Sequence, residues 1–443
     1  MSCRLSGRFA FLAGCLLGLA GTLAGAFVPG RAAGQEAEKV VTLEEAVAAA
    51  LQSHPSLIQG RGAVRTAEAG ERTAWGAFLP SLSLSSGASL SSTERFNPQT
   101  NTTVRGSNDS YSAGVSASLD IFTAGRRGAE LRRARAATEA AEASLVNQRF
   151  AVILSVKQAF FDVLRADELI RVAEAGLNRA REGLEAAQHR MDAGTATRSD
   201  VLRAELEIAN ARQALLQAQA QRRTAAFALG RLIGVDGAVG ARLTQPLEPR
   251  PLPVSDEELA AMVLQSAPSV RAAESAARSA EAGVAAARTA YFPSLRFSGG
   301  YDWFNQNAAL NGGRTSWGMR LSLSYPLFNG FAREASVERA EVEADVARAQ
   351  LEDARRAARA ELERVLADLR LAEQRIALTG EAVRVAEEDL RVQQERYRLG
   401  ASTILEQITS QVNLLQAELD RVAARYDYQI ARAQLEALVG REL

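Results

Sequence analysis

The sequence predicts a mainly helical chain that also carries membrane-embedded β-strands, built from one helix–strand–strand–long helix–helix unit that occurs twice. Three observations predict this fold class: a tandem repeat, paired segments of alternating polarity, and two very long helices with a seven-residue apolar pattern. The composition agrees, since 23% of the 443 residues are charged and only 6% are aromatic. Such a profile is typical of long helices.

The repeat is visible as a constant offset between matching segments. LQSHPSL at 51–57 recurs as LQSAPSV at 264–270, and the same offset carries Pro80 onto Pro293. From Phe122, which matches Phe328, a slightly shorter offset holds to the end of each copy. We therefore divide the chain into a first repeat at 35–234, a linker at 235–254 and a second repeat at 255–443.

Residues 1–34 are predicted to be a secretory signal peptide, because two arginines precede an apolar run at 9–28 and small residues follow. An uncleaved membrane anchor is the alternative. The segment LAGC, which ends at Cys15, resembles a lipid-attachment signal, but the apolar run continues past the cysteine. The sequence therefore decides neither whether Cys15 is lipidated nor where the signal peptide is cleaved. Cys3 and Cys15 are the only cysteines, so a cleaved chain contains no disulfide.

Each repeat is expected to open with one helix, at 42–73 in the first and 255–290 in the second. Thr42 and Ser255 are the expected N-caps, because a glutamate follows each three residues later, as in a capping box.

Two strands are expected in each repeat, at 79–92 and 110–122, then at 293–304 and 315–328. Apolar side chains alternate there with small polar ones, and strands of this length cross a bilayer when tilted. The secretion signal, Tyr and Trp near strand ends, and polar loops at 93–109 and 305–315 favour membrane strands over a soluble sandwich. Four strands cannot close a transmembrane barrel, because open edges leave backbone groups unpaired in lipid, so more than one chain must contribute.

Long helices are expected at 125–190 and 330–396, each about 100 Å long at 1.5 Å per residue. Apolar residues recur on them at intervals of seven, which predicts side-by-side helix packing. Glycine turns at Gly194 and Gly400 reverse the chain into second helices at 198–233 and 403–439. The apolar residues at intervals of seven are Val156, Val163, Ile170, Leu177, Leu184 and Met191, then Leu362, Leu369, Ile376, Val383, Leu390 and Tyr397.

Nothing in the sequence predicts catalysis or a cofactor. The chain has two histidines, and HExxH, GxxxxGK[ST], GxSxG motifs and cysteine pairs are absent from the sequence. The formal net charge is +0, so no basic field indicates nucleic-acid binding. An enzyme is therefore not expected.

The chain resembles the TolC-like family of outer-membrane efflux proteins over nearly its whole mature length. The resemblance rests on the tandem repeat, the PSL at each first strand, the Phe-x-x-Gly or Phe-x-Gly turn after each second strand, and the segment YRLGASTILE that starts at Tyr397. It implies a homotrimer in outer-membrane lipid, with a twelve-stranded β-barrel continued by an α-helical barrel through the periplasm. It also implies two partners, a periplasmic adaptor protein and an inner-membrane transporter that supplies the energy.

In that family, acidic residues just beyond the glycine turns line a pore constriction, and the matching positions here are Asp200 and Glu406. Ser402 and Thr409 depart from the family pattern, so the resemblance does not identify the residues that hold the channel closed. The expected adaptor-docking surface is the pair of hairpin tips, 190–197 and 396–403. Its named residues are Arg190, Met191, Gly194, Arg396, Tyr397 and Gly400.

The resulting hypothesis is an outer-membrane channel of a tripartite efflux or type I secretion system. The alternative is a periplasmic coiled-coil scaffold or adaptor, which a duplicated strand pair between long helices does not favour. The transported substrate and the class of transporter do not follow from the sequence.

Overall fold

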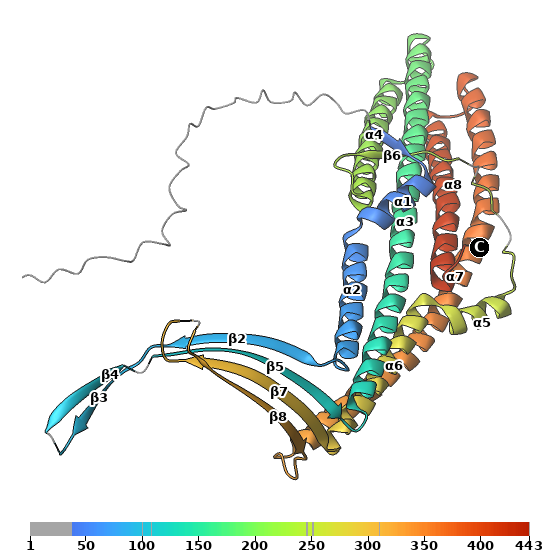
Figure 1. The fold of residues 1–443 in the computed structure, drawn as a ribbon. Helices are drawn as coiled ribbons and strands as arrows, with labels where there is room; N and C mark the ends of the chain where they lie inside the picture. Colours follow the sequence, from blue (N-terminus) through green and yellow to red (C-terminus); the bar gives the residue numbers. More distant parts are fainter. Residues whose placement is uncertain are drawn as a thin grey trace, which may run out of the picture. The chain divides into compact units, whose positions relative to one another are not determined.

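A computed structural model describes residues 38–99, 101–107, 109–244, 247–249, 252–309 and 311–442 (Figure 1). The predicted signal peptide and Cys15 lie outside this part of the chain. Among the described residues, none of the helices is both long enough and apolar enough to cross a membrane.

The opening helix of each repeat is two helices, not the single helix that the sequence pattern predicted. The first repeat has α1 (Leu43–Ser53) and α2 (Pro55–Gly76), and the second has α5 (Asp256–Ser266) and α6 (Pro268–Arg288). The break falls at Pro55 and Pro268 because proline lacks the N–H that an unbroken helix needs, and it disfavours helical geometry in the residue before it. Both expected N-caps are confirmed: the Thr42 and Ser255 hydroxyls accept from the backbone N–H groups of Glu45 and Glu258.

Four strands form one antiparallel sheet in the order β2-β5-β7-β8. Their bounds are Ser81–Ser89, Ser110–Phe122, Ser294–Asn305 and Arg314–Ser324. Ser81 pairs with Ser118 in β5, and Ser294 pairs with Ser324 in β8. Ser294 and Ser324 are the second-repeat counterparts of Ser81 and Ser118, so both repeats share one strand register.

The two faces of this sheet differ in polarity. Leu84, Val115, Tyr301 and Trp317 lie opposite one another across the four strands, and they are 79%, 42%, 55% and 73% exposed. On the other face the hydroxyls of neighbouring serines are hydrogen-bonded, with 2.7 Å between Ser83 Oγ and Ser116 Oγ. One face is therefore apolar and uncovered within the chain, and the other is polar.

The expected polar loop at 93–109 was wrong over most of its length. Residues Ser92–Asn97 (β3) and Thr102–Ser107 (β4) pair as an antiparallel hairpin beyond the four-stranded sheet. The β-branched run Thr102, Thr103 and Val104 favours a strand. We predicted a loop there because the surrounding segment is polar. The predicted linker at 235–254 also contains a strand, Val239–Ala241 (β6), which pairs in parallel with Lys39–Val41 (β1).

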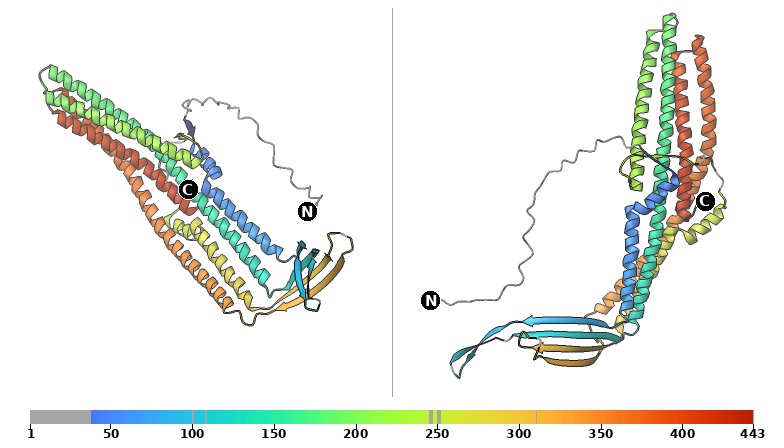
Figure 2. Two further views of the ribbon diagram at one scale, coloured as in Figure 1. Left: turned by 90° about the vertical axis from the view of Figure 1, so that its left-hand side faces the viewer. Right: turned by 45° about the horizontal axis from the view of Figure 1, so that its top comes forward.

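Each repeat continues into a long helix and a shorter returning helix. The long ones are α3 (Arg126–Asp192) and α7 (Ala332–Arg398), of 67 residues each, and the returning ones are α4 (Arg198–Ile233) and α8 (Ile404–Val439), of 36 each. Where the returning helices run beside the long ones, α4 packs on α3, α3 on α8 and α8 on α7 (Figure 2). Most of the seven-residue pattern marks the buried side, since Val156, Leu177, Leu369, Val383 and Leu390 are at most 5% exposed. Met191, the last residue of the pattern on α3, is 37% exposed instead.

Candidate functional site

The two hairpin tips, 190–197 between α3 and α4 and 396–403 between α7 and α8, have the same turn. Thr195 N–H donates to Arg190 O at 2.8 Å, and its second-repeat counterpart, Ala401 N–H, donates to Arg396 O at 2.7 Å. Gly194 and Gly400 have φ values of +76° and +78°. This is the helix-ending motif in which a left-handed residue satisfies the last carbonyls, and it explains why glycine stands at both positions.

The returning helices begin with matching threonine caps, but their acidic residues differ in environment. Asp200 Oδ2 accepts from both the backbone N–H and the hydroxyl of Thr197, each at 2.8 Å. Glu406 Oε1 accepts the Thr403 hydroxyl at 3.3 Å, and the Glu406 side chain is exposed. The carboxylate of Asp200 is therefore held against the helix start, whereas that of Glu406 extends into solvent.

Hydrogen bonds from Thr197, the backbone N–H first, lower the pKa of the Asp200 carboxyl below its usual range, and Arg203 and Arg190 act in the same direction. Arg203 Nη1 lies 3.9 Å from Asp200 Oδ1. Asp200 is consequently ionised throughout the neutral and mildly acidic range.

Arg190 joins the two hairpins to each other. Its Nη1 donates to Tyr397 O at 2.7 Å, and its guanidinium carbon lies 4.3 Å from the centre of the Tyr397 ring. Tyr397 is 2% exposed and packs in a small cluster with Ala187, Val201 and Ile404. Burial is the main cause of the raised pKa of the Tyr397 hydroxyl, so this hydroxyl stays protonated at physiological pH.

Directly behind this cluster lies a polar layer that the sequence pattern did not indicate. Gln407, Ser410 and Gln411 are buried, and the Ser410 hydroxyl donates to Asp389 Oδ2 at 2.6 Å. Gln411 Nε2 donates to the backbone oxygen of Arg179. The matching positions of the first repeat hold Val201, Ala204 and Glu205. This difference between the repeats is the signal that could have revealed the layer.

The structure thus gathers most of the predicted tip residues in one region. Arg190 and Tyr397 are in contact, and Arg190 Nη2 lies 3.7 Å from where a Cβ on Gly400 would stand. Met191 and Arg396 lie in the last helical turns of α3 and α7. Asp200 and Glu406 stand at equivalent positions near the starts of α4 and α8.

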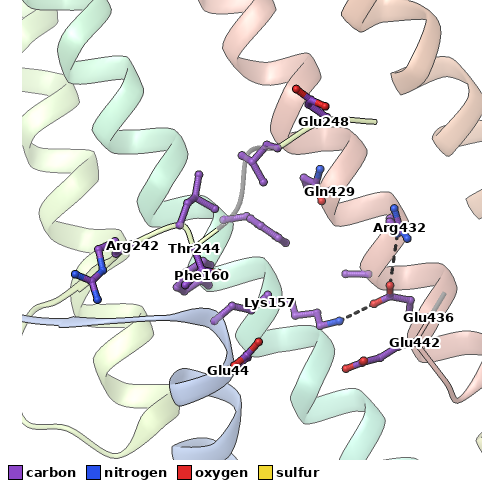
Figure 3. Close-up of a pocket in the computed structure, with 15 residues that line it drawn as sticks. Glu44, Lys157, Phe160, Arg242, Thr244, Glu248, Gln429, Arg432, Glu436 and Glu442 are labelled. Carbon is purple, nitrogen blue, oxygen red and sulfur yellow. Dashed lines mark hydrogen bonds and ion pairs between the residues drawn. The ribbon is translucent and has the colours of Figure 1, made fainter. Parts of the chain in front are cut away.

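Away from the tips, a cavity lies near the β1–β6 pair, between α3 and α8 (Figure 3). This cavity of about 350 Å³ contains an ion-paired cluster, in which Glu436 binds Lys157 at 2.5 Å and Arg432 at 3.6 Å. All three side chains are at most 17% exposed, so these contacts join α3 to α8. Within the described part of the chain, His, Cys, Asp and Glu nowhere gather in a group able to hold a metal ion.

Comparisons with known proteins agree with this architecture. The family model described as "Outer membrane efflux protein" matches residues 46–235 and 259–441. Protein CyaE of Bordetella pertussis is 30% identical over 89% of this chain and 81% of its own length. The pyoverdine export outer membrane protein OpmQ of Pseudomonas aeruginosa is 28% identical over 85% and 79%.

Solved structures share the fold at lower identity. The Campylobacter jejuni CmeC outer membrane channel superposes with a TM-score of 0.79 at 17% identity, covering 90% of this chain and 85% of CmeC. The Vibrio cholerae outer membrane protein VceC gives 0.75 at 22% identity, covering 90% and 96%.

Proposed function

Because this chain belongs to the outer membrane efflux protein family, we propose that three copies of it form one channel that closes at the hairpin tips. It is an outer-membrane channel component of an efflux system, and its long helices extend into the periplasm. The family consists of conduits and not of enzymes. Membership also decides against the periplasmic scaffold or adaptor that the sequence left open.

The main support for an assembly of several copies is that the two outer strands of the four-stranded sheet have no partner strand beyond them in the described part of the chain. Strands β2 and β8 are its outer strands, and leucines such as Leu84 and Leu323 on them are 79% and 69% exposed. Lipid accepts such a face only if the edges are paired, because unpaired backbone groups cost several kcal/mol each in hydrocarbon. Pairing β8 of one copy with β2 of the next closes a barrel, and three copies supply the twelve strands that the family resemblance implies.

The family resemblance implies the partners, and the length of the long helices supports where they would meet the channel. At 1.5 Å per residue, the 67 residues of α3 place the tips about 100 Å from the strands. The tips therefore point toward the inner membrane and serve as the docking surface for a periplasmic adaptor. An inner-membrane transporter supplies the energy, and the channel itself is passive. Type I secretion remains the alternative to small-molecule efflux.

The acidic residues at the tips form the proposed constriction. Asp200 and Glu406 are the third residues of α4 and α8, and three copies contribute six carboxylates. A narrow channel of low dielectric focuses their field, so cations are attracted and anions repelled.

The experiment is to purify the protein in detergent, measure its mass by native mass spectrometry and record it in planar bilayers. We expect a particle of three copies that forms cation-preferring channels. A monomer that conducts, or a soluble periplasmic protein, would overturn the proposal.

A further inference from the structure

The charged side chains of the four-stranded sheet all lie on its polar face, which lines the lumen of the proposed barrel. In the registers of the four strands, each charged residue stands on the same face as the hydrogen-bonded serines Ser83 and Ser116. Arginines outnumber aspartates there, so each chain brings a net positive charge into the lumen. The charged residues are Asp120 on β5, Arg296 and Asp302 on β7, and Arg314 and Arg320 on β8.

At the end of this face that joins the helices, two arginines share a single carboxylate. Arg296 donates from Nε to Asp120 Oδ1 at 2.6 Å and from Nη2 to Asp120 Oδ2 at 3.5 Å. Arg126, the first residue of α3, places its Nη2 3.2 Å from Asp120 Oδ2. The Arg296 side chain is nevertheless 62% exposed. Asp120 thus fixes two of the three guanidinium nitrogens of Arg296, and Nη1 is left for another ligand.

Arg320 on β8 is the diagonal neighbour of Arg296 on β7. Arg296 pairs with Ser322 in the β7–β8 ladder, and the next pair on the same face joins Arg320 to Ser298. Diagonal neighbours are about 7–8 Å apart, which is within reach of long side chains. Arg320 is exposed, and among the described residues no carboxylate pairs with it. Two like charges at this spacing repel each other, and an anion bound between them relieves the repulsion.

The approach to Arg320 is open. The next pair on this face is Gly300 with Gly318, and a Cβ at Gly318 would meet no atom within 4 Å. Asp302 Oδ1 lies over Gly114, which belongs to β5 on the other side of β7. A molecule in the lumen therefore reaches Arg320 over Gly318 without passing a carboxylate.

The neighbouring copy in the proposed barrel does not neutralise Arg320 either. There β8 pairs with β2 of the next copy, and β2 contains serines, leucines, a glycine and an alanine. Because β2 has no charged residue, this conclusion is independent of the register in which the two strands pair. The positive charge of Arg320 consequently persists in the assembled barrel.

We propose that Arg296 and Arg320 form an anion-binding site in each chain, so that three such sites line the barrel near the end that joins the helices. Guanidinium groups bind the oxygens of phosphate and carboxylate groups strongly, and the hydroxyls of Ser298 and Ser322 add further donors. The ligand class is a molecule with several phosphate or carboxylate groups. The inference rests on the proposed trimeric channel and adds a basic exit to its acidic entrance.

Binding is tested by calorimetric titration of inorganic pyrophosphate into the detergent-solubilised trimer at low salt, without divalent cations. We expect one site per chain. Arg320→Gln should weaken binding about tenfold or more, because a charged hydrogen bond is lost, and Arg320→Lys should restore part of the affinity. Native mass spectrometry of each variant confirms that the trimer is intact.

The matched control is Arg314→Gln, which removes an arginine from the same face at the other end of β8 and should leave the affinity nearly unchanged. Equal weakening by Arg314→Gln would indicate a diffuse positive field instead of a site. An unchanged affinity in Arg320→Gln, or no binding to the wild type, would likewise overturn the inference.

Planar bilayers test whether the site acts on molecules inside the channel. The background is Asp200→Asn with Glu406→Gln, in which the tip carboxylates no longer repel the probe. We expect pyrophosphate to reduce the conductance, and Arg320→Gln, but not Arg314→Gln, to abolish this block. A conducting trimer whose block is unaffected by Arg320→Gln overturns the inference but leaves the proposed function standing. Absence of a trimer or of conduction overturns both.

Discussion

Arg190 in the first hairpin and Tyr397 in the second form the contact that ties the two halves of the chain together at the tips. The guanidinium stacks 4.3 Å from the ring centre and also donates to the Tyr397 carbonyl at 2.7 Å. The ring is buried and the hydrogen bond is partly buried, so both interactions are stronger than they would be in water. The repeat provides its own comparison, because the matching pair is Arg396 and Met191.

Replacing Arg190 with alanine should loosen the tips and raise the open probability of the channel. Loss of the stacking contact and of a charged hydrogen bond weakens the joint by roughly 2 kcal/mol. Arg190→Lys should recover only part of the closed state, because an ammonium lacks the planar guanidinium. Single-channel recordings measure the open probability. Arg396→Ala is the matched control, and an equal effect of both alanine variants would show that the Tyr397 ring contributes nothing.

Replacing Gly194 and Gly400 with valine should abolish export while the trimer persists. Both glycines have positive φ, and a side chain in that conformation costs about 1–2 kcal/mol at each turn. The turns would rearrange, and the adaptor would lose its docking surface. Substrate export and the mass of the detergent-solubilised particle are the two measurements.

The control for the turn variants is Gly380→Val, a helical position in α7 where an added Cβ meets no atom within 4 Å and φ is not positive. Full export in this variant separates the effect of the turns from that of a β-branched residue. Normal export after disruption of both turns would place adaptor docking elsewhere.

Much of the fold could be predicted because repetition and periodicity are local signals. The alternation of Leu82 and Leu84 with serines predicted a strand, and the seven-residue spacing through Val163 and Leu369 predicted the buried sides of α3 and α7. Pro55 and Pro268 also carry a local signal, because proline disfavours an unbroken helix. We predicted one helix there because the apolar pattern continues across both prolines.

The site was harder to predict because its contacts join distant segments. Arg190 and Tyr397 were both expected at the tips, but their stacking depends on how the two hairpins pack, which no local pattern encodes. The different environments of Asp200 and Glu406 depend on side-chain orientation, since both follow a threonine cap by three residues. The seven-residue stripe does not indicate the buried polar layer around Gln407.

Neutralising the tip carboxylates should reduce cation selectivity without loss of assembly. Asp200→Asn with Glu406→Gln removes six charges from the proposed constriction. The asparagine oxygen can still accept from Thr197 at the start of α4, so the expected loss of stability is that of a charge at a helix N-terminus, about 0.3–1 kcal/mol. Reversal potentials in a salt gradient and block by multivalent cations measure the effect. Asp353→Asn, on an α7 side chain that is 79% exposed, is the control for a general loss of negative charge. Reversal potentials and block that match the wild type would mean that these carboxylates face away from the pore.

The pH dependence of selectivity should depend on the cap of α4. Hydrogen bonds from Thr197 lower the pKa of Asp200, so the stabilisation they provide is present above the unfolded-state value of about 3.9 and is lost as pH falls through the folded pKa. In a Glu406→Gln background, selectivity due to Asp200 should therefore persist below that ordinary value. Thr197→Ala removes the hydroxyl donor, costs about 1 kcal/mol of helix capping and should move the loss of selectivity to higher pH. Reversal potentials recorded from neutral to acidic pH follow this change, with Thr403→Ala, the matching cap of α8, as the control. If Thr197→Ala leaves the pH midpoint where it was, the Thr197 hydroxyl does not set the charge of Asp200.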